Sequence, residues 1–305
     1  DLVNSGNVLT LAGGTLALKG SSGATDSQTF ASTTMSANRG STITLTQNGA
    51  TSLTLDLGAI TRNTGSTVNF NVVPLTAGVI AKTATANEAS GILGPWVTVG
   101  ATTALQYGTV NGSSQIVSYA GATAATAGNL SNVTSPTANY SFGAAATLIG
   151  DITGNTLRYT GAAAILANGG FNTTLNGLMN AGTGALTISG AGNLTIGANK
   201  ELVIIGNNQG TTISPLIVDN GGGASSLTYS GAATLNINNN ANAYTGGTTI
   251  NSGTLAFGVA GSGSITDTPL GTGPVTVNSG ATLALSRTYL ANPLTPNNAT
   301  VTAGN

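Results

Sequence analysis

The 305-residue sequence predicts an all-β solenoid, and three observations support that fold class. Charged residues make up only 5% and apolar residues 40%, while 45 glycines interrupt nearly every window that could form a helix. Short segments such as Thr42–Thr46 and Thr67–Val72 alternate apolar and polar residues with the period of a strand. Related segments also recur along the chain, which is typical of solenoids whose coils contact only their neighbours.

The clearest repeat unit spans Tyr244–Gly258 and reads as two short strands around a tight corner. At the corner, Gly253 can take the positive φ that a sharp turn needs, and Asn251 can bond its own backbone. A unit this short cannot bury its apolar residues alone, so we expect it to stack on copies of itself. The positions on which the pattern depends are Tyr244, Gly246, Gly247, Ile250, Gly253, Leu255 and Phe257.

Copies of this unit occur elsewhere in the chain. Val277–Leu285 repeats the corner and the second strand with one residue inserted after the glycine, and Val3–Leu11 repeats it in register with that copy. A second kind of repeat pairs Leu157–Ala163 with Leu227–Ala233. The structural positions expected in the Val277 copy are Val277, Gly280, Leu283 and Leu285.

The Tyr244–Gly258 segment resembles the autotransporter-associated β-strand repeat of large secreted bacterial passenger and surface proteins. The resemblance covers one complete copy, a partial copy at 275–285 and a looser one at 3–11. It implies a parallel β-helix exposed outside the cell, and it implies no single biochemical activity.

We predict one continuous β-solenoid over residues 1–305, irregular or loop-rich at about 76–150 and repeat-like at 151–290. The strand spacing suggests coils of about 20 residues with two or three strands each. Ser21–Asn38 breaks the strand rhythm and is predicted to protrude as a loop. The other strands expected within residues 1–75 and 151–260 are Val8–Leu11, Thr15–Leu18, Ser52–Leu57, Ala185–Ser189, Asn193–Ile196, Glu201–Ile205, Leu216–Asp219, Leu227–Ser230 and Leu235–Asn238.

Two polar or aromatic features leave alternatives open. Trp96, the only tryptophan, is expected to anchor a loop onto the coils, since tryptophan buries a large area; the alternative is sugar stacking at an exposed ring. The asparagine run at 236–242 forms either a ladder of stacked amides or a solvated turn cluster.

The residue inventory favours no catalytic, cofactor or metal site. Histidine and cysteine are both absent, which removes the commonest general base, nucleophile and metal ligands. The eight acidic residues include no adjacent or alternate pair, and Lys200-Glu201 reads as an exposed local pair. Seven scattered basic residues argue against nucleic-acid binding, and no apolar run approaches the ~18 residues of a membrane helix.

The sequence therefore predicts a non-catalytic structural protein, which the resemblance places outside the cell at a bacterial surface. The residues at both ends of the sequence have the pattern of β-strands. We therefore expect the protein to assemble end to end, either with other copies of itself or with flanking repeats of a longer chain. The alternative is an adhesin passenger, whose loops at Ser21–Asn38 and Lys82–Trp96 would bind surface glycans or a host ligand. A polysaccharide-active enzyme is the second alternative and requires two facing carboxylates.

Overall fold

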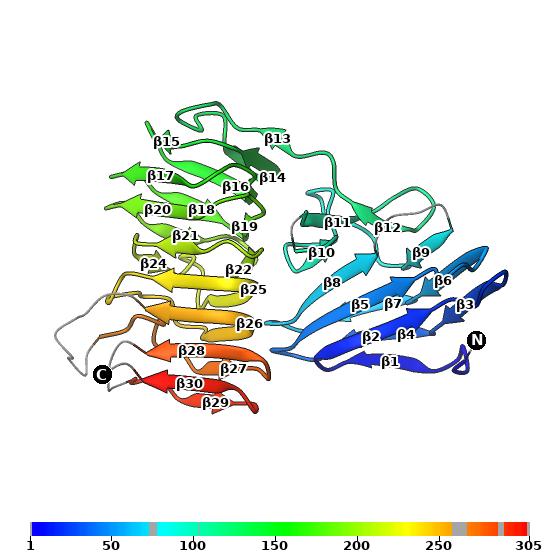
Figure 1. Cartoon of the computed structure of the whole chain (residues 1–305). Helices are drawn as coiled ribbons and strands as arrows, with labels where there is room; N and C mark the ends of the chain where they lie inside the picture. The colour runs from blue at the N-terminus through cyan, green and yellow to red at the C-terminus, as the bar shows by residue number, and fades with distance from the viewer. Residues whose placement is uncertain (1, 73–77, 103, 258–266, 286–289, 304–305) are drawn as a thin grey trace. The chain divides into compact units, whose positions relative to one another are not determined.

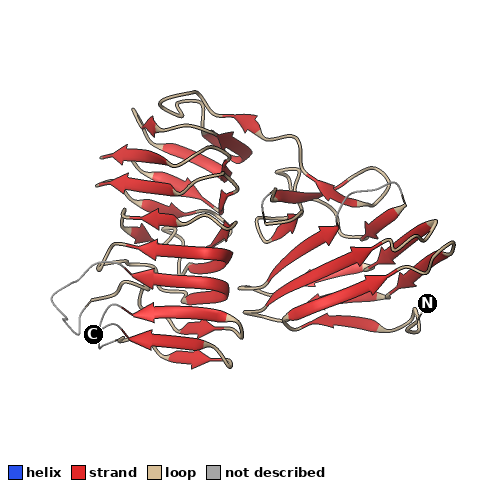
Figure 2. Ribbon diagram, viewed as in Figure 1, coloured by secondary structure: helices blue, strands red, loops and turns tan. Residues whose placement is uncertain are grey.

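The computed structural model describes residues 2–72, 78–102, 104–257, 267–285 and 290–303, and within these ranges it contains strands and no helix (Figure 2). No helix capable of spanning a membrane is therefore found in the described part of the chain. The chain divides into two compact units, residues 1–121 and 122–305. Each unit has its own apolar core. One continuous stack over the whole chain stays a prediction.

Unit 1 winds three coils of three strands each, and equivalent strands pair in parallel to form three sheets (Figure 1). Ser32 pairs with Ala59 on the next coil, which gives a coil length of 27 residues. The first sheet contains β1 (Val8–Leu11), β4 (Ser32–Met35) and β7 (Ala59–Arg62); the second begins with β2 (Gly14–Lys19), β5 (Gly40–Thr46) and β8 (Thr67–Val72); the third contains β3 (Thr25–Thr29), β6 (Ser52–Asp56) and β9 (Val79–Lys82).

The parallel stack of unit 1 ends at an antiparallel closure. Strand β10 (Val97–Val99) adds to β8 in parallel, and β11 (Gln106–Val110) then runs antiparallel to β10. Strand β12 (Ile116–Ser118) runs antiparallel to β11. This reversal of strand direction ends the parallel stack, because the coils below it all pair in parallel.

Unit 2 is a longer parallel stack in which equivalent strands lie one above the other (Figure 1). Ile152 pairs with Thr173, so one coil takes 21 residues, close to the predicted length. Its strands are β13 (Thr123–Ala124), β14 (Thr134–Phe142), β15 (Ala146–Thr147), β16 (Ile152–Tyr159), β17 (Ala164–Gly169), β18 (Thr173–Leu175), β19 (Gly177–Asn180), β20 (Leu186–Gly190), β21 (Leu194–Ile196), β22 (Glu201–Gly206), β23 (Thr211–Ile213), β24 (Ile217–Val218), β25 (Ser226–Ile237), β26 (Thr248–Phe257), β27 (Val275–Val277), β28 (Ala281–Leu285), β29 (Leu294–Pro296) and β30 (Thr300–Ala303).

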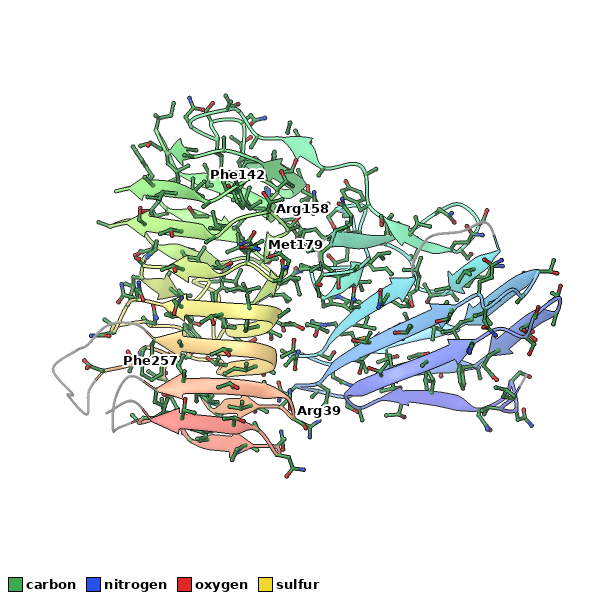
Figure 3. All side chains as sticks on the ribbon, viewed as in Figure 1. Arg39, Phe142, Arg158, Met179 and Phe257 are labelled. Carbon is green, nitrogen blue, oxygen red and sulfur yellow. The ribbon has the colours of Figure 1, made fainter. Side chains whose placement is uncertain are left out.

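The longest strands of unit 2 bend round a corner and join two faces of the coil. The first half of β16 pairs with β18 and its second half with β19. In the same way β26 pairs with β27 before its corner and with β28 after it. Register partners therefore stack directly, as Arg158 and Met179 do on β16 and β19 (Figure 3).

Columns of aliphatic and aromatic side chains fill the interior of unit 2. One column runs through Leu157, Leu178, Ile204, Tyr229 and Ile250, each at most 1% exposed. Burial of each such side chain contributes about 1.5–3 kcal/mol, and the coils share that gain with the neighbours above and below. The predicted all-β solenoid with parallel coils is confirmed.

The predicted loop at Ser21–Asn38 is wrong, because this segment contains the strands β3 and β4. Its inward positions include Gln28 and Thr33, both buried. Polar residues at inward positions hide the apolar alternation by which a strand is normally recognised. By contrast, residues 83–96 contain no strand, as expected for the second candidate loop.

Candidate functional site

The repeat unit recognised in the sequence forms the corner before β26 and all of β26. Tyr244 is completely buried, and its hydroxyl lies 2.6 Å from Thr248 Oγ1. Thr248 Oγ1 also lies 3.2 Å from Leu270 O, so the two hydroxyls and this carbonyl form one connected hydrogen-bond network. Burial raises the pKa of Tyr244 far above its ordinary value, although the bond with Thr248 lowers it slightly. The aromatic ring and its satisfied hydroxyl thus fix this corner inside the stack.

The repeat glycines are required where the backbones of two coils approach closely. Gly247 and Gly253 have φ values of 97° and 74°, which residues other than glycine rarely adopt. A Cβ on Gly253 would also lie 2.6 Å from Gly231 O on the neighbouring coil. At Gly246, a Cβ would lie 2.7 Å from Ser225 O. These glycines therefore set the spacing between the corner and the coil beside it.

The partial copy at Val277–Leu285 stacks directly on the complete copy. Ile250 pairs with Val277 and Leu255 pairs with Leu283, and all four side chains are fully buried. The pair Phe257 and Leu285 continues the same register, with Leu285 half-buried. Gly280 has a φ of 80°, but a Cβ at this position would meet open space. Sequence similarity between the copies is therefore matched by direct stacking. Gly258, the last residue of the recognised pattern, lies outside the described residues.

Two ladders of asparagine amides cross the coils of unit 2, and sequence reasoning located neither. In the first, Asn155 Nδ2 donates to Asn139 Oδ1 at 2.9 Å, and Asn176 Nδ2 donates to Asn155 Oδ1 at 3.0 Å. All three residues are at most 4% exposed. Each amide thus satisfies a buried polar group on the next coil, which fixes the register of the stack.

The second ladder runs through the corner of the repeat. Asn278 Nδ2 donates to Asn251 Oδ1 at 2.7 Å, and Asn297 Nδ2 donates to Asn278 Oδ1 at 3.2 Å. The prediction that Asn251 bonds its own backbone missed this partner on the next coil. The recurrence of Asn-Ser-Gly at 251–253 and 278–280 is the signal in the sequence that points to it.

The asparagine run at 236–242 behaves differently from both ladders. Asn242 accepts from Ile217 N and donates to Pro269 O, so its amide joins backbone groups on the coils on either side. Asn239 Nδ2 donates to Ser214 O at 3.3 Å. The described partners of Asn239 and Asn242 are backbone atoms, Asn242 is buried, and Asn236 lies within β25, so the run fits neither of the two alternatives as a whole.

The second kind of repeat forms corners around a buried tyrosine. Tyr229 Oη donates to Ala233 O at 2.8 Å, and Tyr159 Oη donates to Ala162 O. Both rings are at most 1% exposed, and burial raises the pKa of both hydroxyls. Phe142 packs on Tyr159 with ring centroids 4.9 Å apart. The labelled Phe142 and Phe257 lie in the upper and lower parts of the same stack (Figure 3).

Trp96 lies under the closure of unit 1 and is only 6% exposed. The Arg62 guanidinium carbon is 5.5 Å from the ring centroid, and Arg62 Nε and Nη2 donate to Ser66 O at 3.1 and 3.0 Å. In the preceding loop, desolvation raises the pKa of Glu88, and the positive charge of Arg62 partly offsets that rise. A ring buried to this extent offers no exposed face to a sugar, and the role of loop anchor stays a prediction.

Two acidic residues of unit 2, Glu201 and Asp219, accept hydrogen bonds from the neighbouring coil. Glu201 is buried and accepts from Thr228 Oγ1 at 2.6 Å, so the expected exposed pair with Lys200 is wrong for the glutamate. Asp219 accepts from Ser225 N and from both Thr245 N and Thr245 Oγ1. No group of three potential metal-ligating side chains occurs among the residues that the structure describes.

Comparison with known proteins identifies the repeat on which this geometry is built. The family model described as Passenger-associated-transport-repeat matches residues 227–257, which contain most of β25 and all of β26. Neither the curated proteins nor the solved structures contain a match to the chain. The matched residues include both the Tyr229 corner and the Tyr244 repeat, which stack on consecutive coils. The chain is a β-solenoid protein that carries a repeat of the autotransporter passenger type.

Proposed function

We propose that this protein is a non-catalytic structural segment of a secreted or surface-exposed bacterial passenger. The observation that carries this proposal is the in-register stacking of the repeat copies at 244–257 and 277–285 over a continuous apolar interior. Such a stack gives a stiff element from repeated short coils. The passenger-type repeat supports a location outside the cell.

The partner in this proposal is another passenger-type coil, supplied by a second copy or by flanking repeats. Strands β29 and β30 pair with β27 and β28 along one edge, and their other edge has no strand partner within the described residues. Leu294 and Val301 are 36% and 37% exposed at this rung and continue the columns of Val275 and Leu283. An open edge with apolar inward residues favours the addition of a further coil.

Sedimentation and electron microscopy of the purified chain test the axial association. We expect particles elongated by contact at the β29–β30 edge, and we expect Val301→Asp to weaken that contact because it places a charge in the apolar column. Thr302→Asp is the matched control, since Thr302 is exposed on the same strand and lies outside that column. Monomers at every protein concentration would contradict self-association.

An adhesin role is the second candidate, and one observation favours it. Residues 83–96 form a long strand-free loop in which Ala84, Ala86 and Ala89 are exposed, while Trp96 holds its end against the core. Such a loop can vary at its exposed part without loss of the fold. Replacing the three alanines with aspartate, which adds bulk and charge at exposed positions, should abolish attachment to a ligand-bearing surface if the loop is adhesive, and unchanged attachment would contradict that role.

A further inference from the structure

The first coil of unit 1 differs from the coils above it in what it presents to the interior. On the third sheet, Leu53 and Leu55 of β6 are at most 2% exposed and point into the core. Their register partners on β3 are Asp26 and Gln28. The next coil keeps apolar residues at this column, since Leu55 pairs with Ala81. Among these three strands, polar side chains thus replace the leucines only on β3.

The Gln28 amide is fully used by backbone groups of residues 2–3 and of Thr29. Its Oε1 accepts from Leu2 N and Val3 N, both at 2.9 Å. Its Nε2 donates to Val3 O at 3.0 Å and to Thr29 O at 2.9 Å. An amide offers two acceptor and two donor positions, so all four are satisfied. Gln28 is therefore 4% exposed because the segment at residues 2–3 lies against it.

One oxygen of the Asp26 carboxylate also has a hydrogen-bond donor within the same coil. Its Oδ2 accepts from Ser21 N at 2.6 Å, and the residue is half-buried. The other two strands of this coil keep apolar inward residues, and Leu9, Leu16 and Leu18 pack against the unit 1 core while partly exposed. The polar positions are therefore confined to one of the three sheets.

One polar sheet is sufficient to oppose the addition of a coil. A coil is one continuous turn of chain, so an added coil must cover the edges of all three sheets at once. At β3 it would have to displace residues 2–3 from Gln28 and cover the Asp26 carboxylate with its own apolar interior. Burying a charge or an amide without new partners is unfavourable, and inward-pointing charge is a known protection of strand edges.

We propose that the coil β1–β3 is a built-in cap that blocks axial addition of another coil or a second copy at this edge. The opposite surface of unit 1 is closed by the antiparallel strands β11 and β12. Axial association through unit 1 would then be blocked, which leaves the strand edges of unit 2, among them the β29–β30 edge. This inference deepens the proposed structural function and rests on it for its biological meaning.

The first experiment converts the cap into an apolar coil. The double variant Asp26→Leu, Gln28→Leu restores the leucine pattern of β6, and we expect sedimentation to show at least about a tenfold increase in self-association. The control is Thr25→Leu, Ser27→Leu, which adds two leucines at exposed positions of the same strand. Equal association of the two double variants, or no gain in the first, would overturn the cap.

The second experiment leaves the cap residues intact and uses the absence of cysteine from the chain. Thr10→Cys labels the exposed edge strand β1, and Thr302→Cys labels β30. With a short thiol cross-linker, we expect no cross-linked pair between copies through Cys at position 10. Cross-linking between copies through position 10 would refute the cap while leaving axial association intact. A lack of cross-linking through position 302 alone would refute only the proposed association.

Discussion

Buried amides are the residues that hold neighbouring coils of unit 2 at a fixed offset. Asn155 lies in the middle of the first ladder, between Asn139 and Asn176. The hydrophobic effect that stabilises the aliphatic columns has no preferred direction. Without other contacts, the columns would therefore allow small shifts of register between coils. An amide ladder adds directional bonds that are satisfied at one register only.

Removing the middle amide should therefore destabilise unit 2. Asn155→Ala leaves the buried Asn176 Nδ2 without its acceptor, and we expect a loss of about 2 kcal/mol in the free energy of unfolding. Asn199→Ala is the control, because the Asn199 side chain is exposed in the same unit. Denaturant titration followed by far-UV circular dichroism measures both, and equal losses would contradict the role of the ladder.

The buried tyrosines give the protein a defined sensitivity to alkali. The pKa of Tyr229 is raised from an ordinary value of 10.0 by desolvation, so the unfolded chain loses this proton first as pH rises. The stability that depends on the neutral hydroxyl is complete below pH 10.0 and is lost progressively above it, by up to about 1.4 kcal/mol per pH unit. Tyr229→Phe should reduce that slope when unfolding is measured at several pH values above 10.0. An unchanged slope would contradict this assignment.

At the scale of the repeat element, glycines do two separable things. Gly253 and Gly280 both have positive φ, but only Gly253 faces carbonyl oxygens of the neighbouring coil, with Gly231 O and Ala233 O within 2.7 Å of a Cβ position. Gly280 has no atom within 4 Å of that position. Substitutions at these two positions therefore distinguish the cost of backbone strain from the cost of disturbing the close packing of the coils.

This contrast predicts different costs for the same substitution. Gly280→Ala should cost about 1–2 kcal/mol from the left-handed conformation alone. Gly253→Ala should cost more, by about 1–3 kcal/mol, because the two coils must also move apart. Thermal unfolding of both variants provides the comparison. A smaller loss for Gly253→Ala would show that the corner does not depend on close approach of the coils.

The strand elements are predictable where inward residues are apolar and unpredictable where they are polar. The segment around Leu53 and Leu55 shows a clear period of two, and its strand is found at Ser52–Asp56. The preceding segment carries Gln28 at the equivalent inward position, and its sequence predicts a loop. Only the neighbouring coil reveals that this glutamine faces the interior.

The asparagine ladders show the same limit more sharply. Asn139, Asn155 and Asn176 are separated by unequal sequence distances, because coils differ in length. A single sequence does not state where each coil begins, so it does not state which amides become neighbours. The repeat copies at 244–257 and 277–285 are recognisable because their similarity spans several stacked positions at once.

At the scale of the whole molecule, the two units have separate apolar cores, and the unfolding of each can be followed by a different spectroscopic signal. Trp96 is the only tryptophan and belongs to unit 1. We expect Asn155→Ala to shift the unfolding transition seen by circular dichroism, which unit 2 dominates, without shifting the transition seen by tryptophan fluorescence. Coincident shifts of both transitions would indicate that the units unfold as one cooperative body.

The central claim is that residues of consecutive coils stack directly in register. Thr153, Thr174 and Thr195 are outward positions on three consecutive rungs, paired in the order given. The most direct test places nitroxide labels at Thr153→Cys with Thr174→Cys, and at Thr153→Cys with Thr195→Cys, in this cysteine-free chain. Stacked coils predict Cα separations of about 4.8 Å and about twice that value, so dipolar broadening should be strong in the first pair and clearly weaker in the second. Absent or equal broadening in the two pairs would contradict the solenoid.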